Sequence, residues 1–257
     1  DDAAIATGRS PYDALAGSVL QGKIGSVLLL ADQNNTHATD MLAEKSITTY
    51  KYFGGSALFN NVFKVQLAYE MKFPLYEIEG LVIYLDAGHG WDSSNNNVFD
   101  WGASGNGYRE FGLTKELANK VAAVLRDTYQ VAVYVNDDGG YYAYRQAEAY
   151  AMNAGVLVSI HFNSDGGVGT ARGTESYIHS YNAAPGSDTL QRKTHNALVS
   201  GLGLPDRGMK DEEFAVCGGK VPGVLLEIAF ITSGYDMDVY SSRKDAAAGK
   251  IAQGIAA

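Results

Sequence analysis

Two histidines and two glutamates stand out because of the segments that carry them. His89, His161 and Glu227 each lie in or directly after a strongly apolar run, and Glu110 lies in a Gly-rich stretch between the two histidines. The three runs are residues 81–90 (LVIYLDAGHG), 156–164 (VLVSIHFNS) and 223–232 (GVLLEIAFIT). A carboxylate inside a buried strand is costly unless a metal or a polar partner holds it. Two imidazoles and two carboxylates are the inventory of a catalytic zinc hydrolase, with three ligands, an open position for water and one carboxylate for proton transfer.

The elements that must position these residues alternate along the second part of the chain. Near-continuous apolar runs predict buried strands, and apolar residues at helical spacing predict the helices between them. The predicted strands are residues 81–86, 131–135, 156–162 and 224–230, with 174–178 as an edge strand because its residues alternate. The predicted helices are residues 113–125, 142–153, 188–202 and 242–256. This pattern predicts a three-layer α/β domain, in which ligands bind beyond the carboxyl ends of the strands, where His89 and His161 fall.

Composition narrows the class of protein further. The chain has 257 residues, of which 46% are hydrophobic, and its net charge is −9. It has no basic patch rich enough for a nucleic-acid footprint, so nucleic acid is disfavoured as a partner. It also has no run of about eighteen apolar residues, so no transmembrane helix is expected. The single cysteine, Cys217, excludes an internal disulfide and a cysteine zinc cage.

The first seventy residues form a smaller pattern of alternating elements. Apolar spacing predicts helices at 12–24 and 58–71 and short strands at 27–31 and 49–53. That is half of a βαβα layer with a parallel sheet. A charged, Pro-containing segment at 72–80 follows, and we place the domain boundary there.

Residues 81–257 resemble the zinc-dependent N-acetylmuramoyl-L-alanine amidases of the type 3 family. Seven short blocks carry the resemblance, and they occur in the family's order. The blocks are Asp86-Ala87-Gly88-His89-Gly90, Gly107-Tyr108-Arg109-Glu110, Arg145 ahead of Ala151-Met152-Asn153, Ser159-Ile160-His161-Phe162-Asn163, Gly173-Thr174-Glu175, Arg207-Gly208-Met209-Lys210 and Val224-Leu225-Leu226-Glu227. The resemblance implies a twisted, mostly parallel sheet flanked by helices. It also implies zinc as the cofactor, held by His89, Glu110 and His161, with Glu227 as the catalytic carboxylate.

The expected roles of three other polar residues are less well defined. The resemblance makes Arg145 and Asn163 candidates for substrate contact, although a structural salt bridge is an equal alternative for Arg145. The segment 91–107 is longer and richer in Asn and Ser than the family's corresponding stretch, so Glu116 is the alternative to Glu110 as second ligand.

The remaining histidines and the tyrosine cluster are expected to be structural. His37, His179 and His195 lack a matching context and are interpreted as surface or packing residues. Residues 95–97 are interpreted as a solvated loop, and 141–144 as a half-buried helix face, in preference to sugar or peptide contacts.

Residues 4–71 resemble one copy of the type 2 cell-wall-binding repeat. The matching pieces are Ala6-Thr7-Gly8, Asp13-Ala14-Leu15-Ala16, Leu28-Leu29-Leu30 and Tyr52-Phe53-Gly54-Gly55. Such repeats normally occur in threes, so we expect one of several repeats over 1–73 and a zinc amidase domain over 81–257. The repeats are associated with anionic wall polymers, although this copy is mildly acidic.

The function that the resemblance to the amidases implies is hydrolysis of peptidoglycan at the amide bond between N-acetylmuramic acid and L-alanine. The expected location is secreted or in the cell wall, as a host autolysin or a phage lysin. Two alternatives remain open at this point. One is a zinc carboxypeptidase-type peptidase, and the other is a non-catalytic wall-binding protein that carries an inactive amidase fold.

Overall fold

The computed structural model describes residues 2–7, 27–31, 49–53, 60–70, 74–78, 80–92 and 98–257. The chain divides into two compact units, Asp1–Pro74 and Leu75–Ala257. In the described residues, no helix is both long and apolar enough to cross a membrane.

The N-terminal unit contains a three-stranded parallel sheet in the order β2-β1-β3. Its strands are β1 (Asp2–Thr7), β2 (Val27–Ala31) and β3 (Thr49–Phe53), and α3 (Asn61–Glu70) follows them. Strands β2 and β3 occupy the ranges that the sequence predicts, whereas β1 is an additional strand. The helix expected at 12–24, His37 and the loop at 95–97 lie outside the described residues.

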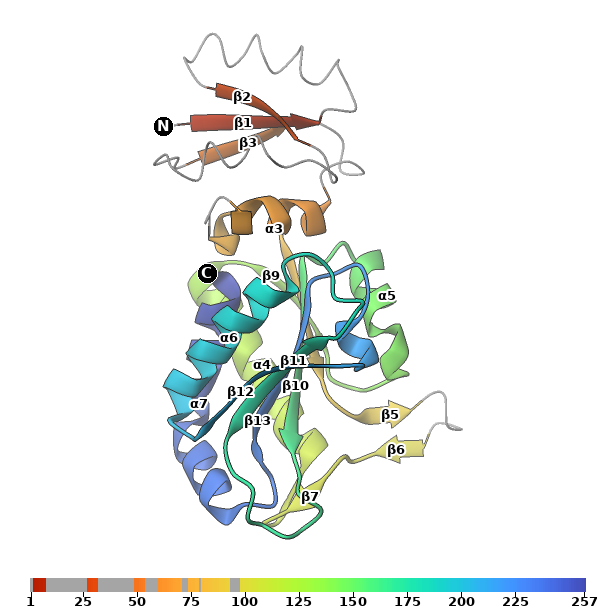
Figure 1. The fold of residues 1–257 in the computed structure, drawn as a ribbon, viewed down its shortest axis with the longest axis vertical. Coiled ribbons are helices and arrows are strands. Elements are labelled where there is room, and N and C mark those ends of the chain that lie inside the picture. The colour runs from red at the N-terminus through yellow and green to blue at the C-terminus, as the bar shows by residue number, and fades with distance from the viewer. Residues whose placement is uncertain are drawn as a thin grey trace. The chain divides into compact units, whose positions relative to one another are not determined.

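The larger unit is built on a six-stranded sheet in the order β12-β11-β13-β10-β4-β9 (Figure 1). Strands β9 (Ala132–Asn136), β4 (Val82–Ala87), β10 (Val156–Asn163) and β13 (Gly223–Phe230) are parallel to one another. Strand β11 (Thr174–His179) runs antiparallel to β13, and β12 (Asp206–Glu212) pairs in parallel with β11 at the edge. The sheet is therefore mostly parallel, as predicted.

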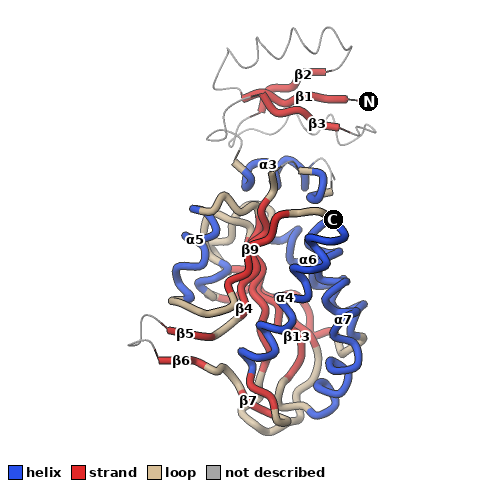
Figure 2. Tube along the Cα trace, turned by 180° about the vertical axis from the view of Figure 1, so that it is seen from behind, coloured by secondary structure: helices blue, strands red, loops and turns tan. Residues whose placement is uncertain are grey.

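Helices cover both faces of this sheet (Figures 1 and 2). Helices α4 (Glu110–Tyr129), α6 (Ser187–Leu202) and α7 (Gly234–Ala256) pack on one face, with α7 against both of the others. The short helix α5 (Arg145–Ala151) lies on the other face with the 3-10 turns η2 (Tyr142–Tyr144) and η3 (Ala215–Cys217). A third turn, η1 (Leu75–Glu77), opens the unit. The three-layer α/β architecture is confirmed.

Two short hairpins lie between β4 and α4. The first pairs β5 (Gly90–Asp92) with β6 (Val98–Asp100), and the second pairs β7 (Ser104–Gly105) with β8 (Tyr108–Arg109). The second hairpin leads directly into Glu110, the first residue of α4.

The expectation that 174–178 forms an edge strand is wrong, because β11 lies between β12 and β13. Its alternating polar residues are buried and have partners inside the protein. Thr174 donates to the carbonyl of Ile228 at 2.8 Å, and Ser176 bonds to His195 at 3.0 Å. Alternation here therefore reflects internal hydrogen bonding and not contact with solvent.

Three predicted helices have different bounds. The helix expected at 113–125 is α4, which is longer at both ends. The helix expected at 142–153 begins as the turn η2 and continues as α5, which ends at Ala151. The helix expected at 242–256 is the second half of α7, which begins at Gly234. Ser233 caps that helix by accepting from the backbone N–H of Asp236, a signal typical of helix starts.

Candidate metal centre

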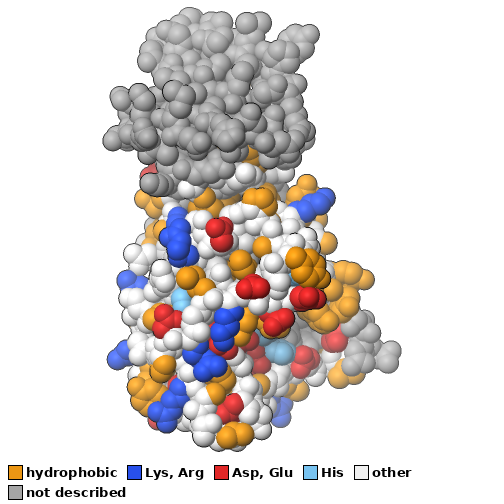
Figure 3. All heavy atoms as spheres, in the orientation of Figure 1, with side chains coloured by type: hydrophobic (Ala, Val, Ile, Leu, Met, Phe, Trp, Pro, Cys, Tyr) orange, Lys and Arg blue, Asp and Glu red, His pale blue; other side chains and the backbone are white. Residues whose placement is uncertain are grey.

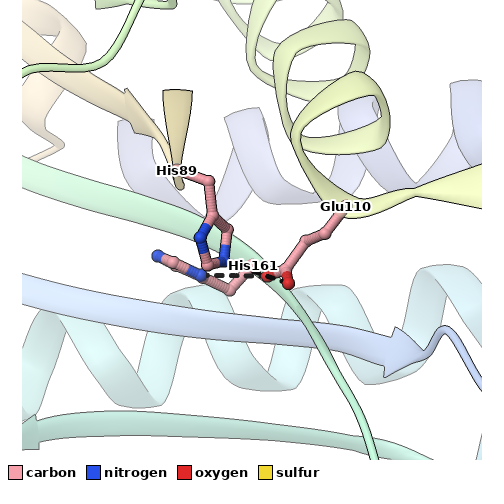
Figure 4. Close-up of side chains that lie close together, drawn as sticks. All are labelled: His89, Glu110 and His161. Carbon is pink, nitrogen blue, oxygen red and sulfur yellow. Dashed lines mark hydrogen bonds and ion pairs between the residues drawn. The ribbon is translucent and has the colours of Figure 1, made fainter. Parts of the chain in front are cut away.

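His89, Glu110 and His161 converge at the carboxyl ends of the parallel strands (Figure 4). Each offers one ligand atom, and these atoms all lie within 4.8 Å of one another. His89 follows β4, His161 lies near the end of β10, and Glu110 begins α4. Three separate elements thus bring together the residues that the sequence singles out.

The two histidines meet because their strands are neighbours in the sheet. Strand β4 pairs with β10 so that Ala87 lies opposite Ile160, and the next residue, Gly88, lies beneath the His161 ring. A Cβ atom at Gly88 would be 2.3 Å from Cε1 of His161, so only glycine leaves room for the imidazole. His89 itself has a φ of +72°, a left-handed conformation that a non-glycine residue adopts only when its surroundings impose it.

Glu110 is held by the backbone as well as by the histidines. Its Oε2 accepts from the N–H of Ala103 at 2.8 Å and its Oε1 from that of Phe162 at 3.0 Å. The same oxygens lie 3.0 Å from Nε2 of His89 and 3.1 Å from Nδ1 of His161. Burial alone would raise the pKa of Glu110, but the hydrogen bonds to the two histidines outweigh it and hold the pKa far below its usual range.

Asp100 orients the His89 ring from the side opposite Glu110. Its Oδ2 lies 2.7 Å from Nδ1 of His89, and its Oδ1 accepts from the N–H of Gly102 at 2.8 Å. Burial would lower the pKa of His89, but the hydrogen bonds to Glu110 and Asp100 raise it to about 9. A carboxylate on one ring nitrogen fixes the tautomer that leaves the other nitrogen for a metal.

Glu227 lies beside the cluster of His89, Glu110 and His161, and one of its carboxylate oxygens accepts no hydrogen bond from the described residues. It lies on β13 directly opposite His161 in the strand register, so both side chains project from the same face of the sheet. Its Oε2 is buried and, among the described residues, has no hydrogen-bond partner. Burial raises the pKa of this carboxyl group to about 7. A buried carboxylate oxygen that no protein group occupies can exchange a proton with a ligand in the cleft.

These side chains open into a cleft of about 550 Å³, whose lining includes His89, His161 and Glu227. The donor set of two imidazole nitrogens and one carboxylate is one that catalytic zinc sites use. Gly102 also fits such a centre. A Cβ at this position would lie 2.5 Å from the His89 ring and 2.6 Å from the Glu110 carboxylate, so only glycine leaves room for both side chains.

Arg145 also lines the cleft, but its guanidinium is already paired. It is buried, with Nε donating to Oδ1 of Asp86 at 2.8 Å and Nη1 to Glu148 at 3.2 Å. The other oxygen of Asp86 accepts from the hydroxyl of Ser159 at 2.7 Å. This network joins α5 to β4 and β10 behind the metal centre, which favours the bracing role for Arg145.

Asn163 and Glu116 lie in other polar networks. The amide of Asn163 donates to Glu175, whose carboxylate also accepts from Arg207 at 3.0 Å and from Lys210. Glu116 accepts from Lys244 on α7 at 2.5 Å. The glutamate that joins the two histidines is therefore Glu110, and the alternative ligand Glu116 is occupied by an ion pair.

Asp100 and Glu175 are polar residues of this region to which the sequence analysis assigned no role. Glu175 belongs to the Gly173-Thr174-Glu175 motif, and Asp100 lies in the segment 91–107, which is longer than the family's corresponding stretch. The sequence signal for Asp100 was its position two residues before Gly102, in a short turn that leads to Glu110.

Two histidines interpreted as surface or packing residues are packing residues. His195 is buried between Ser176 and Asp206, with its Nε2 at 2.9 Å from Oδ1 of Asp206. His179 is buried and its Nδ1 accepts from the backbone N–H of Asn182 at 3.2 Å. The tyrosines at 141–144 differ from expectation, because the side chains of Tyr142 and Tyr144 are mainly exposed.

Comparison with known proteins agrees with the fold and the donor set. The architecture defines an α/β protein with a candidate metallohydrolase centre at the carboxyl ends of its strands. Residues 83–257 match the family described as N-acetylmuramoyl-L-alanine amidase, and the chain belongs to that family.

Individual relatives cover different parts of the chain. It is 28% identical over 237 residues to the N-acetylmuramoyl-L-alanine amidase LytC of Bacillus subtilis, a match that spans 90% of this chain but only 45% of LytC. It is 36% identical over 170 residues to the uncharacterized protein YqiI of Bacillus subtilis, covering 65% of this chain and 78% of YqiI. The crystal structure of an N-acetylmuramoyl-L-alanine amidase from Clostridium difficile 630 matches 69% of this chain and 96% of its own, with a TM-score of 0.61 and 27% identity.

Proposed function

We propose that the unit Leu75–Ala257 hydrolyses the amide bond between the lactyl carbonyl of N-acetylmuramic acid and L-alanine in peptidoglycan. The observation that carries the proposal is the carboxylate oxygen of Glu227, which has no partner among the described residues. Glu227 lies opposite His161 and lines the same cleft as His89 and His161, which cluster with Glu110. Membership of the amidase family supports the same reaction.

Zinc is the cofactor that we propose for His89, Glu110 and His161. When bound, such an ion acts as a Lewis acid and lowers the pKa of a water molecule from 15.7 to about 7. Glu110 would supply the one negative charge among the three ligands, and its two backbone hydrogen bonds hold its carboxylate in place. Asp100 keeps Nδ1 of His89 occupied, so that Nε2 faces the centre.

Glu227 is the residue that moves the proton. Its Oε2 accepts a proton from the attacking water and then returns it to the nitrogen of the departing amine. The second transfer is needed because an unprotonated amide nitrogen is a very poor leaving group. A carboxyl group whose pKa is raised to about 7 is suited to both directions of transfer near neutral pH.

The direct experiment is digestion of purified peptidoglycan by the wild type and by Glu227→Gln. Mass spectrometry identifies the soluble products, and zinc is quantified in both proteins. Free stem peptides that begin with L-alanine, produced by the wild type alone while both proteins bind zinc, support the proposal. Single amino acids would instead indicate a carboxypeptidase, and no product from zinc-loaded wild type would contradict an enzymatic function.

We further propose that the unit Asp1–Pro74 is a cell-wall-binding repeat and that the protein acts in the cell wall after secretion. The sequence motifs shared with the repeat, together with the parallel sheet of β1, β2 and β3, support this assignment. Sedimentation of the full chain carrying Glu227→Gln with purified walls tests it without digestion. Binding that is lost when anionic polymers are stripped from the walls would identify those polymers as the partner, and binding that persists would point to peptidoglycan.

A further inference from the structure

Three exposed aromatic side chains line the cleft that holds the candidate metal centre. Trp91 on β5, Tyr142 in η2 and Phe214 just before η3 are 52%, 59% and 37% exposed. A single exposed aromatic side chain is ordinary, but three of them around one cleft indicate a contact surface.

Each of these rings is supported by a second aromatic ring. The centroid of Trp91 lies 5.1 Å from that of Phe99 at an interplanar angle of 87°, and Phe214 lies 5.2 Å from Tyr177 at 82°. Tyr142 lies 5.0 Å from Tyr141 at 65°. Edge-to-face packing holds a ring in one orientation, and a rigid aromatic residue loses little conformational entropy when it binds a ligand.

The backbone also ties Trp91 to the segment that leads to Tyr142. The N–H of Trp91 donates to the carbonyl of Asp138 at 3.0 Å, and Trp91 forms a β-bridge with Gly139. A Cβ at Gly139 would lie 2.1 Å from the Trp91 nitrogen, and its φ of +99° also favours glycine. The β5–β6 hairpin and η2 are therefore fixed to each other, which sets the spacing of the two rings.

Charge differs between the cleft wall that carries these rings and the edge of the sheet beyond Glu227. That edge lies outside the cleft lining. The carboxylates of Asp92 and Glu213 adjoin Trp91 and Phe214 in sequence and line the same cleft. Figure 3 shows acidic and hydrophobic side chains together at the right of the larger unit, and Lys and Arg side chains, with some acidic ones among them, towards its left.

The basic side chains beyond Glu227 come from β12. Arg207 and Lys210 pair with Glu175, which lies opposite Glu227 in the strand register. A stem peptide ends in a carboxylate, whereas the glycan strand is rich in hydroxyl groups and in pyranose C–H faces. The acidic and aromatic wall of the cleft therefore suits the sugars, and the sheet edge with Arg207 and Lys210, two cations that share the one carboxylate of Glu175, suits the peptide.

We infer that Trp91, Tyr142 and Phe214 form a sugar-binding rim, which stacks against the pyranose rings of the glycan strand that flank the muramic acid at the scissile bond. The aromatic faces take the C–H surface of the sugar, and Asp92 and Glu213 accept hydrogen bonds from its hydroxyl groups. This inference rests on the proposed function for the identity of the glycan. It adds the side of the cleft on which the glycan lies and the residues that bind it.

The test is binding of glycan strands freed of their stem peptides, measured by calorimetry on the zinc-loaded full chain. We expect Trp91→Ala and Tyr142→Ala each to weaken binding roughly tenfold, as the loss of a stacked aromatic anchor does in other interfaces. Tyr235→Ala is the matched control, because Tyr235 is 50% exposed on α7 and does not line the cleft. Its affinity should equal that of the wild type.

Kinetics provide the second readout. On intact peptidoglycan the rim variants should raise KM with little change in kcat, and on a single muramoyl-peptide without flanking sugars they should match the wild type. Undiminished glycan binding in both rim variants would overturn the inference, as would a loss of affinity for free stem peptide instead. Failure of the proposed function is distinguishable, because then the wild type would release no stem peptides whatever its affinity for glycan.

Discussion

Two glutamates on neighbouring strands of this protein have opposite surroundings. Glu175 on β11 and Glu227 on β13 lie opposite each other in an antiparallel register, so they share a face of the sheet. The carboxylate of Glu175 accepts from Asn163, Arg207 and Lys210, whereas Oε2 of Glu227 has no partner among the described residues. Burial tends to raise both pKa values, but only Glu175 has the hydrogen-bond donors that reverse the effect and lower its pKa.

The contrast shows that burial alone does not decide what a carboxylate does. A fully partnered carboxylate joins strands, and a buried one with a free oxygen is available to move protons. The two glutamates differ in this way although they lie on adjacent strands of the sheet.

Glu227→Gln should produce the largest effect. Removing the proton acceptor should lower the rate of peptidoglycan hydrolysis by roughly a thousandfold, within the range that general acid–base groups contribute. Zinc content should stay at the wild-type level, because Glu227 is not among the three clustered ligands. Rate assays beside elemental analysis check both statements, and a parallel loss of zinc would show that Glu227 is itself a ligand.

Asp100→Asn should weaken zinc binding by roughly 10- to 100-fold, as the loss of an orienting partner does in other metal sites. Asp100, like Glu175, is a carboxylate with both oxygens in use, here on His89 and the backbone of Gly102. Competition with a chelator of known affinity measures the change. Asp245→Asn is the control, because that exposed carboxylate on α7 pairs with Lys120 on α4 and does not line the cleft. Equal zinc affinity in the Asp100→Asn and Asp245→Asn variants would contradict an orienting role for Asp100.

Glu175→Gln should act on stability more than on turnover. It leaves Arg207 and Lys210 without their carboxylate, and both are partly exposed, so the expected loss is about 2 kcal/mol in the free energy of unfolding. Urea denaturation measures the change. If hydrolysis fell as steeply as in Glu227→Gln while stability was unchanged, Glu175 would belong to the catalytic group and the contrast would fail.

In chelator-treated protein, Glu175 and Glu227 should contribute to the free energy of unfolding with opposite dependence on pH. The pKa of Glu175 is lower in the folded protein than in the unfolded chain, so its contribution is present above the ordinary carboxyl pKa and is lost as the pH falls. The pKa of Glu227 is raised from 4.5 to about 7, so the folded protein loses stability as the pH rises between these values.

Urea titrations across this range give the measurement. Glu175→Gln should reduce the loss of stability in acid, and Glu227→Gln should gain stability relative to wild type as the pH rises towards 7. Parallel curves for the two variants would show that the two carboxyl groups have similar surroundings after all.

The sequence by itself determined the strands that carry the centre and the identity of its main residues. Apolar runs that end in His89, or that contain His161 and Glu227, predict buried strands with polar residues at their carboxyl ends. Because the carboxyl ends of parallel strands meet at one edge of a sheet, the convergence of the two histidines followed from local patterns. The resemblance to the amidases added Glu110 as the third member of the cluster.

Only the tertiary structure decided which polar groups became partners. The interior position of β11, the pairing of Arg207 and Lys210 with Glu175, and the bond from Asp100 to His89 join segments far apart in sequence or across a turn. The rim of Trp91, Tyr142 and Phe214 likewise comes from three separate elements. Strand order and side-chain pairing depend on which elements pack together. Local residue types and spacing do not reveal which distant segments become neighbours.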